Sequence, residues 1–263
     1  MTTAVCDRTE QSVSRNWEGR SVVASHSKCE PDAEALAWLD LQSQALEDAS
    51  PEEIIQWAVE HYHPKLAMAT AFGPEGCLIL SMLAVIEPSV YVFNLETGYQ
   101  FQETLDTRER IARKYGLVVD LQRPDLAVEH YEAMHGGPIY KTDPDRCCRD
   151  RKLAVLHRVA ANYSAWMTGI RRDQSPHRAK APIVGWDKKF GLVKINPLAN
   201  WTHKRVWARV VQEDIPYNPL HDQGYSSIGC RPCTRPVQSG DDERAGRWGG
   251  TGKTECGLHT TDG

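Results

Sequence analysis

Two pairs of cysteines have the spacing of metal ligands. Cys147 and Cys148 are adjacent, and Cys230 and Cys233 form a C-x-x-C pair much later in the chain. Four thiolates can bind either a zinc ion or a 4Fe–4S cluster. A redox dithiol is the alternative for C-x-x-C alone, but such motifs favour an early strand–helix junction, and this one follows a loop at 225–229. Structural zinc usually uses two matched C-x-x-C pairs, so the adjacent pair favours the cluster.

A single thiol, Cys256, lies near the C-terminus in the segment Glu255-Cys256-Gly257-Leu258-His259. The region 219–263 holds nearly half of the chain's 19 glycines and almost no aliphatic residues after Val237. Such a segment buries too little apolar surface to fix itself, so we expect a flexible tail over 236–263. A movable, exposed thiol suits a shuttling nucleophile. The alternatives are an incidental thiol and a fifth metal ligand.

Basic side chains accompany these thiols and could bind an anion. Lys152 follows the first cysteine pair, Arg171 follows a turn at Gly169, and Arg244 and Arg247 precede Cys256. Guanidinium and ammonium groups bind phosphate and sulfate through charge-assisted hydrogen bonds. A solvated surface charge is the alternative for each of them. Four more basic residues extend the loop after Gly169: Arg172, His177, Arg178 and Lys180.

Composition restricts the class of protein. The 263 residues are 41% hydrophobic and 25% charged, and 31 Lys+Arg against 35 Asp+Glu give a formal charge of −4. This balance disfavours a general polyanion binder, so we expect no nucleic acid partner. No apolar run reaches the ~18 residues of a membrane span. The polar stretch 1–30 reads as a mobile arm without a secretory signal, so we expect a cytoplasmic protein whose cysteines are not paired in disulfides.

Strand and helix patterns alternate over 31–235, which we expect to be one domain. Ser50-Pro51-Glu52-Glu53 predicts a capped helix start. Further on, strands are expected at 66–70, 90–94, 118–121 and 165–168, and helices at 75–86, 102–115, 125–135 and 149–161. This order predicts an α/β, Rossmann-like, mainly parallel sheet with helices on both faces. Ligands bind beyond the carboxyl ends of such strands, here the loops 71–76, 95–99 and 169–180.

The first of these loops, Thr70-Ala71-Phe72-Gly73-Pro74-Glu75-Gly76, resembles the modified phosphate-binding loop of adenine nucleotide α-hydrolase-like folds. Backbone N–H groups at the start of a helix can cradle an anion. A plain strand–helix turn is the alternative. The loop lacks the Ser-Gly-Gly-x-Asp-Ser form of ATP pyrophosphatases, which disfavours a magnesium-dependent attack on ATP.

Three motifs together carry a resemblance to a known family. They are the two cysteine pairs, the segment Trp166-Met167-Thr168-Gly169-Ile170-Arg171-Arg172-Asp173-Gln174-Ser175 and the sequence Glu-Cys-Gly-Leu-His. They follow one another along this chain in the order that is typical of that family. From about Leu66 to His259 the chain resembles assimilatory adenylyl-sulfate (APS) reductases, the iron–sulfur branch of the APS/PAPS reductase family. One departure is Ala71, where family members often carry Ser.

The resemblance implies a function and a set of site residues. The function is reduction of APS to sulfite and AMP in sulfate assimilation and cysteine biosynthesis, with thioredoxin or a similar dithiol as reductant. Cys256 would be the nucleophile that forms an S-sulfocysteine. The cluster ligands would be Cys147, Cys148, Cys230 and Cys233. Substrate contacts are expected from Phe72, Gly73, Glu75, Leu95, Thr97, Gly98, Lys152, Gly169, Arg171, Arg244, Arg247 and His259.

Competing functions remain open at this point. A PAPS reductase or a dual enzyme would need a pocket for a 3′-phosphate. A tRNA sulfur-transfer enzyme with a zinc module conflicts with the −4 charge and with the Glu-Cys-Gly-Leu-His tail. A structural zinc adaptor would leave Cys256 without a task. Cys6, Cys29 and Cys77 lie in no motif, and the sequence is compatible with a homo-oligomer.

Overall fold

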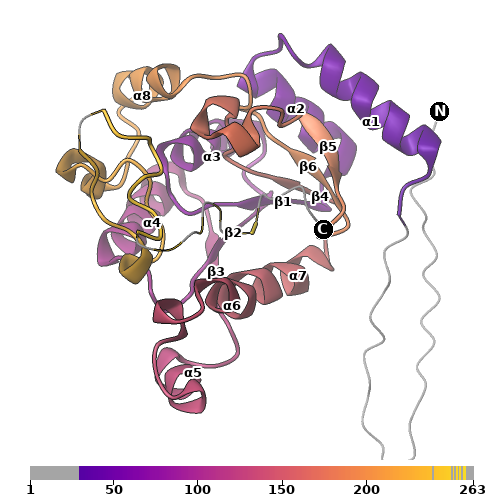
Figure 1. Cartoon of the computed structure of the whole chain (residues 1–263). Coiled ribbons are helices and arrows are strands. Elements are labelled where there is room, and N and C mark those ends of the chain that lie inside the picture. Colours follow the sequence, from indigo (N-terminus) through magenta and orange to yellow (C-terminus); the bar gives the residue numbers. More distant parts are fainter. Residues whose placement is uncertain are drawn as a thin grey trace, which may run out of the picture.

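A six-stranded sheet forms the centre of the computed structural model, which describes residues 30–238, 240–249, 251, 253, 255, 257 and 258. The strand order is β3-β2-β1-β4-β6-β5 (Figure 1). All neighbouring strands are parallel except β5 and β6. The strands are β1 (Leu66–Ala69), β2 (Tyr91–Leu95), β3 (Val119–Gln122), β4 (Ala165–Met167), β5 (Val184–Asp187) and β6 (Leu192–Ile195). The expected mainly parallel α/β sheet is confirmed.

The helices connect these strands in the order that the sequence predicted. They are α1 (Ala33–Ala45), α2 (Pro51–Tyr62), α3 (Pro74–Ile86), α4 (Gln102–Tyr115), α5 (Val128–His135), α6 (Pro144–Cys148), α7 (Ala154–Ala160) and α8 (His203–Gln212). The expected helix at 149–161 is present as a π-helical turn, Arg149–Leu153, that continues into α7. Among the described residues, no helix is long and apolar enough to cross a membrane.

Alternation along the strands builds a core on each face of the sheet. In β1, Leu66 and Met68 pack into the larger core with α2, α3 and α8, whereas Ala67 points into the smaller core with α7. In β4, Trp166 lies on the same face as Ala67. Because successive side chains of a strand point to opposite faces, both faces are apolar and need helices to cover them.

The helix caps follow the local chemistry of the sequence. The Ser50 hydroxyl accepts a hydrogen bond from the backbone N–H of Glu53 (3.3 Å), and a Glu53 carboxylate oxygen accepts one from the Ser50 N–H (2.7 Å). This capping box satisfies two N–H groups that the first turn of α2 leaves free. The predicted start of α2 is therefore confirmed.

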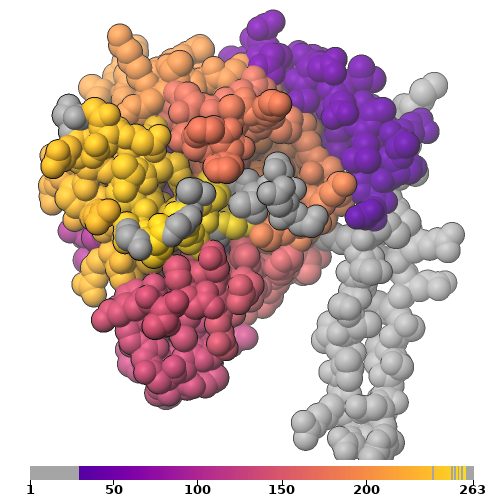
Figure 2. All heavy atoms as spheres, in the orientation of Figure 1, coloured from indigo at the N-terminus to yellow at the C-terminus, as the bar shows by residue number. Residues whose placement is uncertain are grey.

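The glycine-rich C-terminal segment packs more closely than its composition predicts. Arg247 forms an antiparallel bridge with Thr234, and the Arg235 N–H donates to the Gly246 carbonyl (2.9 Å). Trp248 is only 4% exposed. Figure 2 shows this segment, in yellow, lying against the magenta and orange parts of the chain. Packing of one large aromatic side chain thus holds backbone that has few aliphatic residues of its own.

Candidate active site

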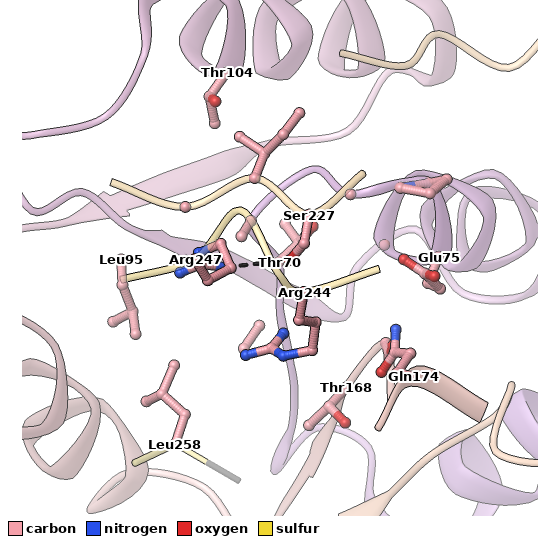
Figure 3. A pocket seen from close by; sticks show the side chains of 18 of the residues that line it. Thr70, Glu75, Leu95, Thr104, Thr168, Gln174, Ser227, Arg244, Arg247 and Leu258 are labelled. Carbon is pink, nitrogen blue, oxygen red and sulfur yellow. Dashed lines mark hydrogen bonds between the residues drawn. The ribbon is translucent and has the colours of Figure 1, made fainter. Parts of the chain in front are cut away.

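A cavity of about 220 Å³ lies at the carboxyl ends of the central strands. Its walls come from the loops that follow β1, β2 and β4, and from the C-terminal segment. Thr70, Leu95 and Thr168 mark the three strand ends in Figure 3, and Arg244 and Arg247 face them from the C-terminal segment. The cavity is therefore where the parallel topology predicts a ligand site.

The loop after β1 lines this cavity, and hydrogen bonds of Thr70 fix its shape. Asn94 Nδ2 donates to the Thr70 carbonyl (2.7 Å), and the Thr70 hydroxyl accepts from the Phe72 N–H (3.0 Å). Gly73 is the N-cap of α3 and has no side chain with which to occupy the first turn. A Cβ on Gly76 would lie 2.5 Å from Thr70 Oγ1, so the close approach of loop and helix requires glycine there. The start of α3 can bind an anion.

Arg171 is buried beside this loop in a network of carboxylates. Its side chain is 0% exposed, and Nε donates to Glu75 (2.7 Å) while one terminal nitrogen donates to both oxygens of Glu243 (3.1 and 3.2 Å). The other terminal nitrogen donates to Asp173. Burial alone would lower the pKa of Arg171, but the charges of Glu75 and Glu243 outweigh it and raise the pKa. Arg171 thus organises the loops around the cavity and does not line it.

Glu255 joins two other arginines at the cavity wall. Its Oε2 accepts from Nε (3.1 Å) and a terminal nitrogen (2.8 Å) of Arg178, and its Oε1 accepts from Arg244 (2.9 Å). The Glu255 side chain is 5% exposed and that of Arg178 is 8% exposed. Because each carboxylate oxygen has a guanidinium donor, this buried charge is well compensated.

Arg247 and Lys152 place positive charge between the large cavity and the cysteines. The Arg247 guanidinium lies 4.4 Å from the centroid of the Trp248 ring and donates to the Ser227 hydroxyl (3.3 Å), the contact dashed in Figure 3. Its Nε is buried and has no hydrogen-bond partner in the part of the chain that the structure describes. Both cations line the large cavity and also the small one that holds the cysteines. A buried donor left over at a cavity wall points to an anionic ligand there.

The two cysteine pairs, far apart in sequence, meet around a cavity of about 20 Å³. Cys147 and Cys148 end α6, while Cys230 and Cys233 bracket a 3-10 turn, and none of these four is in a disulfide. The Arg231 N–H donates to the Tyr99 carbonyl (2.7 Å), which fixes the second pair beside the loop after β2.

Neighbouring charges set the pKa values of these thiols differently. Burial, followed by the charges of the other three cysteines, raises the pKa of Cys147 to about 12. Burial would also raise the pKa of Cys230, but the Lys152 ammonium, a hydrogen bond with Thr97 (Oγ1 to Sγ 3.3 Å) and Arg247 together lower it. A group of thiols that repel one another as anions is stabilised when a metal centre takes up their charge.

The donor set can hold a metal cofactor with more than one metal atom. No three His, Cys, Asp or Glu side chains in the described residues are grouped as ligands of one metal ion. Structural zinc requires four ligands on one ion, with sulfurs about 2.3 Å from it. In a 4Fe–4S cluster each iron takes its own thiolate, so the four sulfurs lie further apart. Four thiols that meet at one small cavity are a donor set for such a metal cofactor.

The structure brings together most of the site residues expected from the sequence. Eight line the large cavity: Gly73, Glu75, Leu95, Thr97, Lys152, Gly169, Arg244 and Arg247. Arg178, from the basic loop, lines it as well. Cys256 and His259 lie outside the described residues.

Other expected contacts lie elsewhere. Phe72 is 1% exposed and packs in the larger core, with φ +57° reversing the chain before Gly73. Gly98 lines a separate surface hollow. Arg172 forms an ion pair with Glu47, and His177 and Lys180 are exposed. For Phe72 and Arg171, sequence spacing alone did not separate a loop residue that faces the cavity from one that supports it.

Sequence reasoning overlooked the acidic partners and one aromatic residue. Glu243 and Glu255 hold the arginines, and Trp248 lies under three cations, Arg244, Arg247 and Lys253. Glu255 could have been identified from the sequence, because it directly precedes Cys256. Trp248 was the one Trp, Phe or Tyr in the polar segment 236–263.

The match with known proteins agrees with this geometry. The model of the phosphoadenosine phosphosulfate reductase domain matches residues 65–236, which include all six strands and both cysteine pairs. The chain belongs to this family.

Its relatives carry two substrate names. A phosphoadenosine 5′-phosphosulfate reductase of Gloeobacter violaceus is 48% identical over 81% of this chain and 90% of its own length. An adenosine 5′-phosphosulfate reductase of Bacillus pumilus is 44% identical over 78% of this chain and 89% of its own.

Solved structures show the same fold. The phosphoadenylyl-sulfate reductase of Candida auris, in a phosphate complex, superposes with a TM-score of 0.69 at 29% identity, covering 80% of this chain and 99% of that one. An FMN adenylyltransferase of Candida glabrata reaches a TM-score of 0.52 at 16% identity, covering 80% of this chain and 69% of that one, and shares only the fold.

Proposed function

We propose that this protein is an adenylyl-sulfate reductase, which converts APS to sulfite and AMP with a thioredoxin-like dithiol as the reductant. The observation that carries this proposal is that two distant cysteine pairs meet beside an arginine-lined cavity at the carboxyl edge of the sheet. The membership in the reductase family and the relatives named adenosine 5′-phosphosulfate reductase support it.

A 4Fe–4S cluster is the cofactor that the four converging thiols fit. Cys147, Cys148, Cys230 and Cys233 would each bind one iron. The cluster would supply a fixed charge beside the substrate and rigidity to the loops, because thiol chemistry already provides the two electrons of the reaction. A reducing compartment such as the cytoplasm would keep the cysteines of this proposed chemistry as thiols.

The cavity supplies separate positions for the two ends of APS. The adenosine would lie against Leu95 and Thr97 at the end of β2, with backbone support from Gly73 and Gly169. The phosphosulfate would lie between Arg247, Arg244 and Lys152, whose side chains line the cavity wall. His259 remains a proposed further contact. Arg171 would act on the substrate only by holding Glu75 and the loop after β1.

The reaction would proceed in two displacements. The Cys256 thiolate attacks the sulfur of APS, a sulfur–sulfur bond forms, and the sulfur–oxygen bond breaks so that AMP leaves with the electron pair. The arginines offset charge that develops on the phosphate oxygens. A thiolate of the reductant then attacks the Cys256 sulfur and displaces sulfite. Its second thiol resolves the mixed disulfide, which returns Cys256 to the thiol and leaves the reductant as a disulfide.

PAPS is the second candidate substrate, because the Gloeobacter relative carries that name. The comparison of kcat/KM for APS and PAPS under identical conditions separates the two. We expect higher kcat/KM with APS, and equal or better use of PAPS would contradict the assignment.

Iron analysis tests the cofactor. Protein purified without oxygen should be brown and contain about four irons per chain, and Cys147→Ser and Cys230→Ser should lose iron and activity together. Cys29→Ser, a cysteine outside every motif, is the matched control and should retain both. Normal iron in Cys230→Ser would contradict the ligand assignment.

A further inference from the structure

The carboxylate of Glu255 is bound more completely than an ordinary surface acid. It is the residue that precedes Cys256 in the sequence, and its side chain is 5% exposed. Arg178 donates two hydrogen bonds to one oxygen and Arg244 donates one to the other. Three charge-assisted bonds to one carboxylate make a strong local attachment.

The attachment point is itself fixed by the body of the protein. Arg178 also donates to Gln174 Oε1 (2.5 Å), and that oxygen accepts the backbone N–H of Arg171 (3.1 Å). Arg171 in turn is fully buried among three carboxylates. The guanidinium that receives Glu255 therefore belongs to the rigid loop after β4.

The chain is also held on the other side of Cys256. Lys189 Nζ donates to the Gly257 carbonyl (2.6 Å), and Leu258 packs against both the smaller core and the pair Cys148 and Trp248. Lys189 lies in the turn between β5 and β6. The two sequence neighbours of the nucleophile are thus attached to two different parts of the fold.

We propose that Glu255 is a positioning residue, which docks the C-terminal segment on Arg178 and so holds Cys256 at the cavity. The carboxylate also occupies Arg244, one of the cations proposed to bind the phosphosulfate. Docking of the tail and binding of the substrate anion therefore share one guanidinium. Removal of the charge at Glu255 takes one acidic partner from Arg244 and releases the nucleophile. The part that concerns catalysis rests on the proposed function, while the docking itself does not.

Thiol alkylation measures docking without any substrate. Holoenzyme is treated with iodoacetamide, and the rate of modification at Cys256 is followed by peptide mass mapping. We expect Glu255→Gln, which keeps the shape and removes the charge, to raise this rate about tenfold, as the loss of a charged hydrogen bond predicts. Arg178→Gln should raise it by a smaller factor, because Arg244 still donates to Glu255, and the double variant should add little to Glu255→Gln because Arg178 acts through that carboxylate. Glu255→Asp should restore part of the protection.

Two further measurements separate positioning from general stability. Glu52→Gln removes a carboxylate that pairs with Arg209 on the helices, away from the cavity lining, and should leave the alkylation rate at Cys256 unchanged. With APS, Glu255→Gln should form the adduct about tenfold more slowly in a single turnover, while its iron content and its affinity for APS do not fall.

The outcomes distinguish the two proposals. Alkylation at the wild-type rate in both Glu255→Gln and Arg178→Gln, or an equal rise in Glu52→Gln, would overturn the docking role. A rise in the alkylation rate that is limited to the Glu255 and Arg178 variants supports docking even if APS proves not to be the substrate. Absence of any adduct in the wild type would contradict the proposed function alone.

Discussion

Arg171 and Arg247 show two opposite uses of the same side chain. Arg171 is fully buried and its nitrogens donate to Glu75, Asp173 and Glu243. Arg247 stacks on Trp248, donates to a neutral hydroxyl and forms no ion pair with a carboxylate of the described residues. Its buried Nε lacks a partner there.

The difference lies in what satisfies the charge. A guanidinium that is fully buried and already donates to three carboxylates has its charge compensated within the protein, so its role is to hold loops together. A guanidinium whose charge faces an aromatic ring and an open cavity keeps hydrogens for an anion. The partners of an arginine, rather than its place in a motif, indicate whether it binds substrate.

Substitution of Arg171 should give the largest effect on stability. Arg171→Gln removes the fully buried guanidinium that Glu75 and Glu243 share, which costs about 3–5 kcal/mol. For a domain of this size the Tm should fall by roughly 6–20 °C, measured by thermal scans of holoenzyme. A fall below 2 °C, with only the KM for APS raised, would instead make Arg171 a substrate ligand.

Substitution of Arg247 should affect binding more than stability. Arg247→Gln removes charged hydrogen bonds worth about 1.5–3 kcal/mol to an anion, so the KM for APS should rise roughly 10- to 100-fold. The fall in Tm should be much smaller than that of Arg171→Gln, and iron content should be retained. An unchanged KM together with a large loss of Tm would remove the distinction between the two arginines.

The neighbouring pair of Arg172 and Glu47 should give the smallest effect. The hydrogen bond from Arg172 holds the pKa of the Glu47 carboxyl below its ordinary value. The pair therefore contributes stability above the pKa of the unfolded chain, and this contribution is lost as the pH falls through the folded pKa. Because Glu47 is 42% exposed, solvent screening limits the contribution to less than about 1 kcal/mol.

Thermal scans of the wild type and Glu47→Gln between pH 6 and acid pH test this. The difference in Tm between them should shrink as the pH falls. A difference that grows on acidification would contradict the sign of the pKa shift.

Much of the sheet could be predicted because its signals are local. The residues of β1 and α4 and the capping box at Ser50 carry their own periodicity or cap chemistry. The hairpin of β5 and β6 was missed, since each strand has four residues and depends on pairing with its neighbour. The helix α8 was missed although Thr202 caps it and Val206 and Val210 are spaced for burial.

The residue types of the site could be predicted from the sequence, but the contacts between those residues could not. The cysteine pairs and the basic residues are visible as motifs. The ion pair of Glu255 and Arg178, in contrast, joins residues far apart in sequence. Only the fold brings such residues together. For the same reason, the sequence did not separate the buried Arg171 from the cavity-lining Arg247.

The fate of Cys256 tests the central claim most directly. Holoenzyme is incubated with APS in the absence of reductant, AMP is quantified, and every cysteine peptide is mapped by mass. The account predicts one sulfonate on Cys256 for each AMP released, sulfite on addition of thioredoxin, and no adduct in Cys256→Ser, which should keep its iron. A sulfonate on Cys6, Cys29 or Cys77, or full turnover by Cys256→Ser, would contradict it.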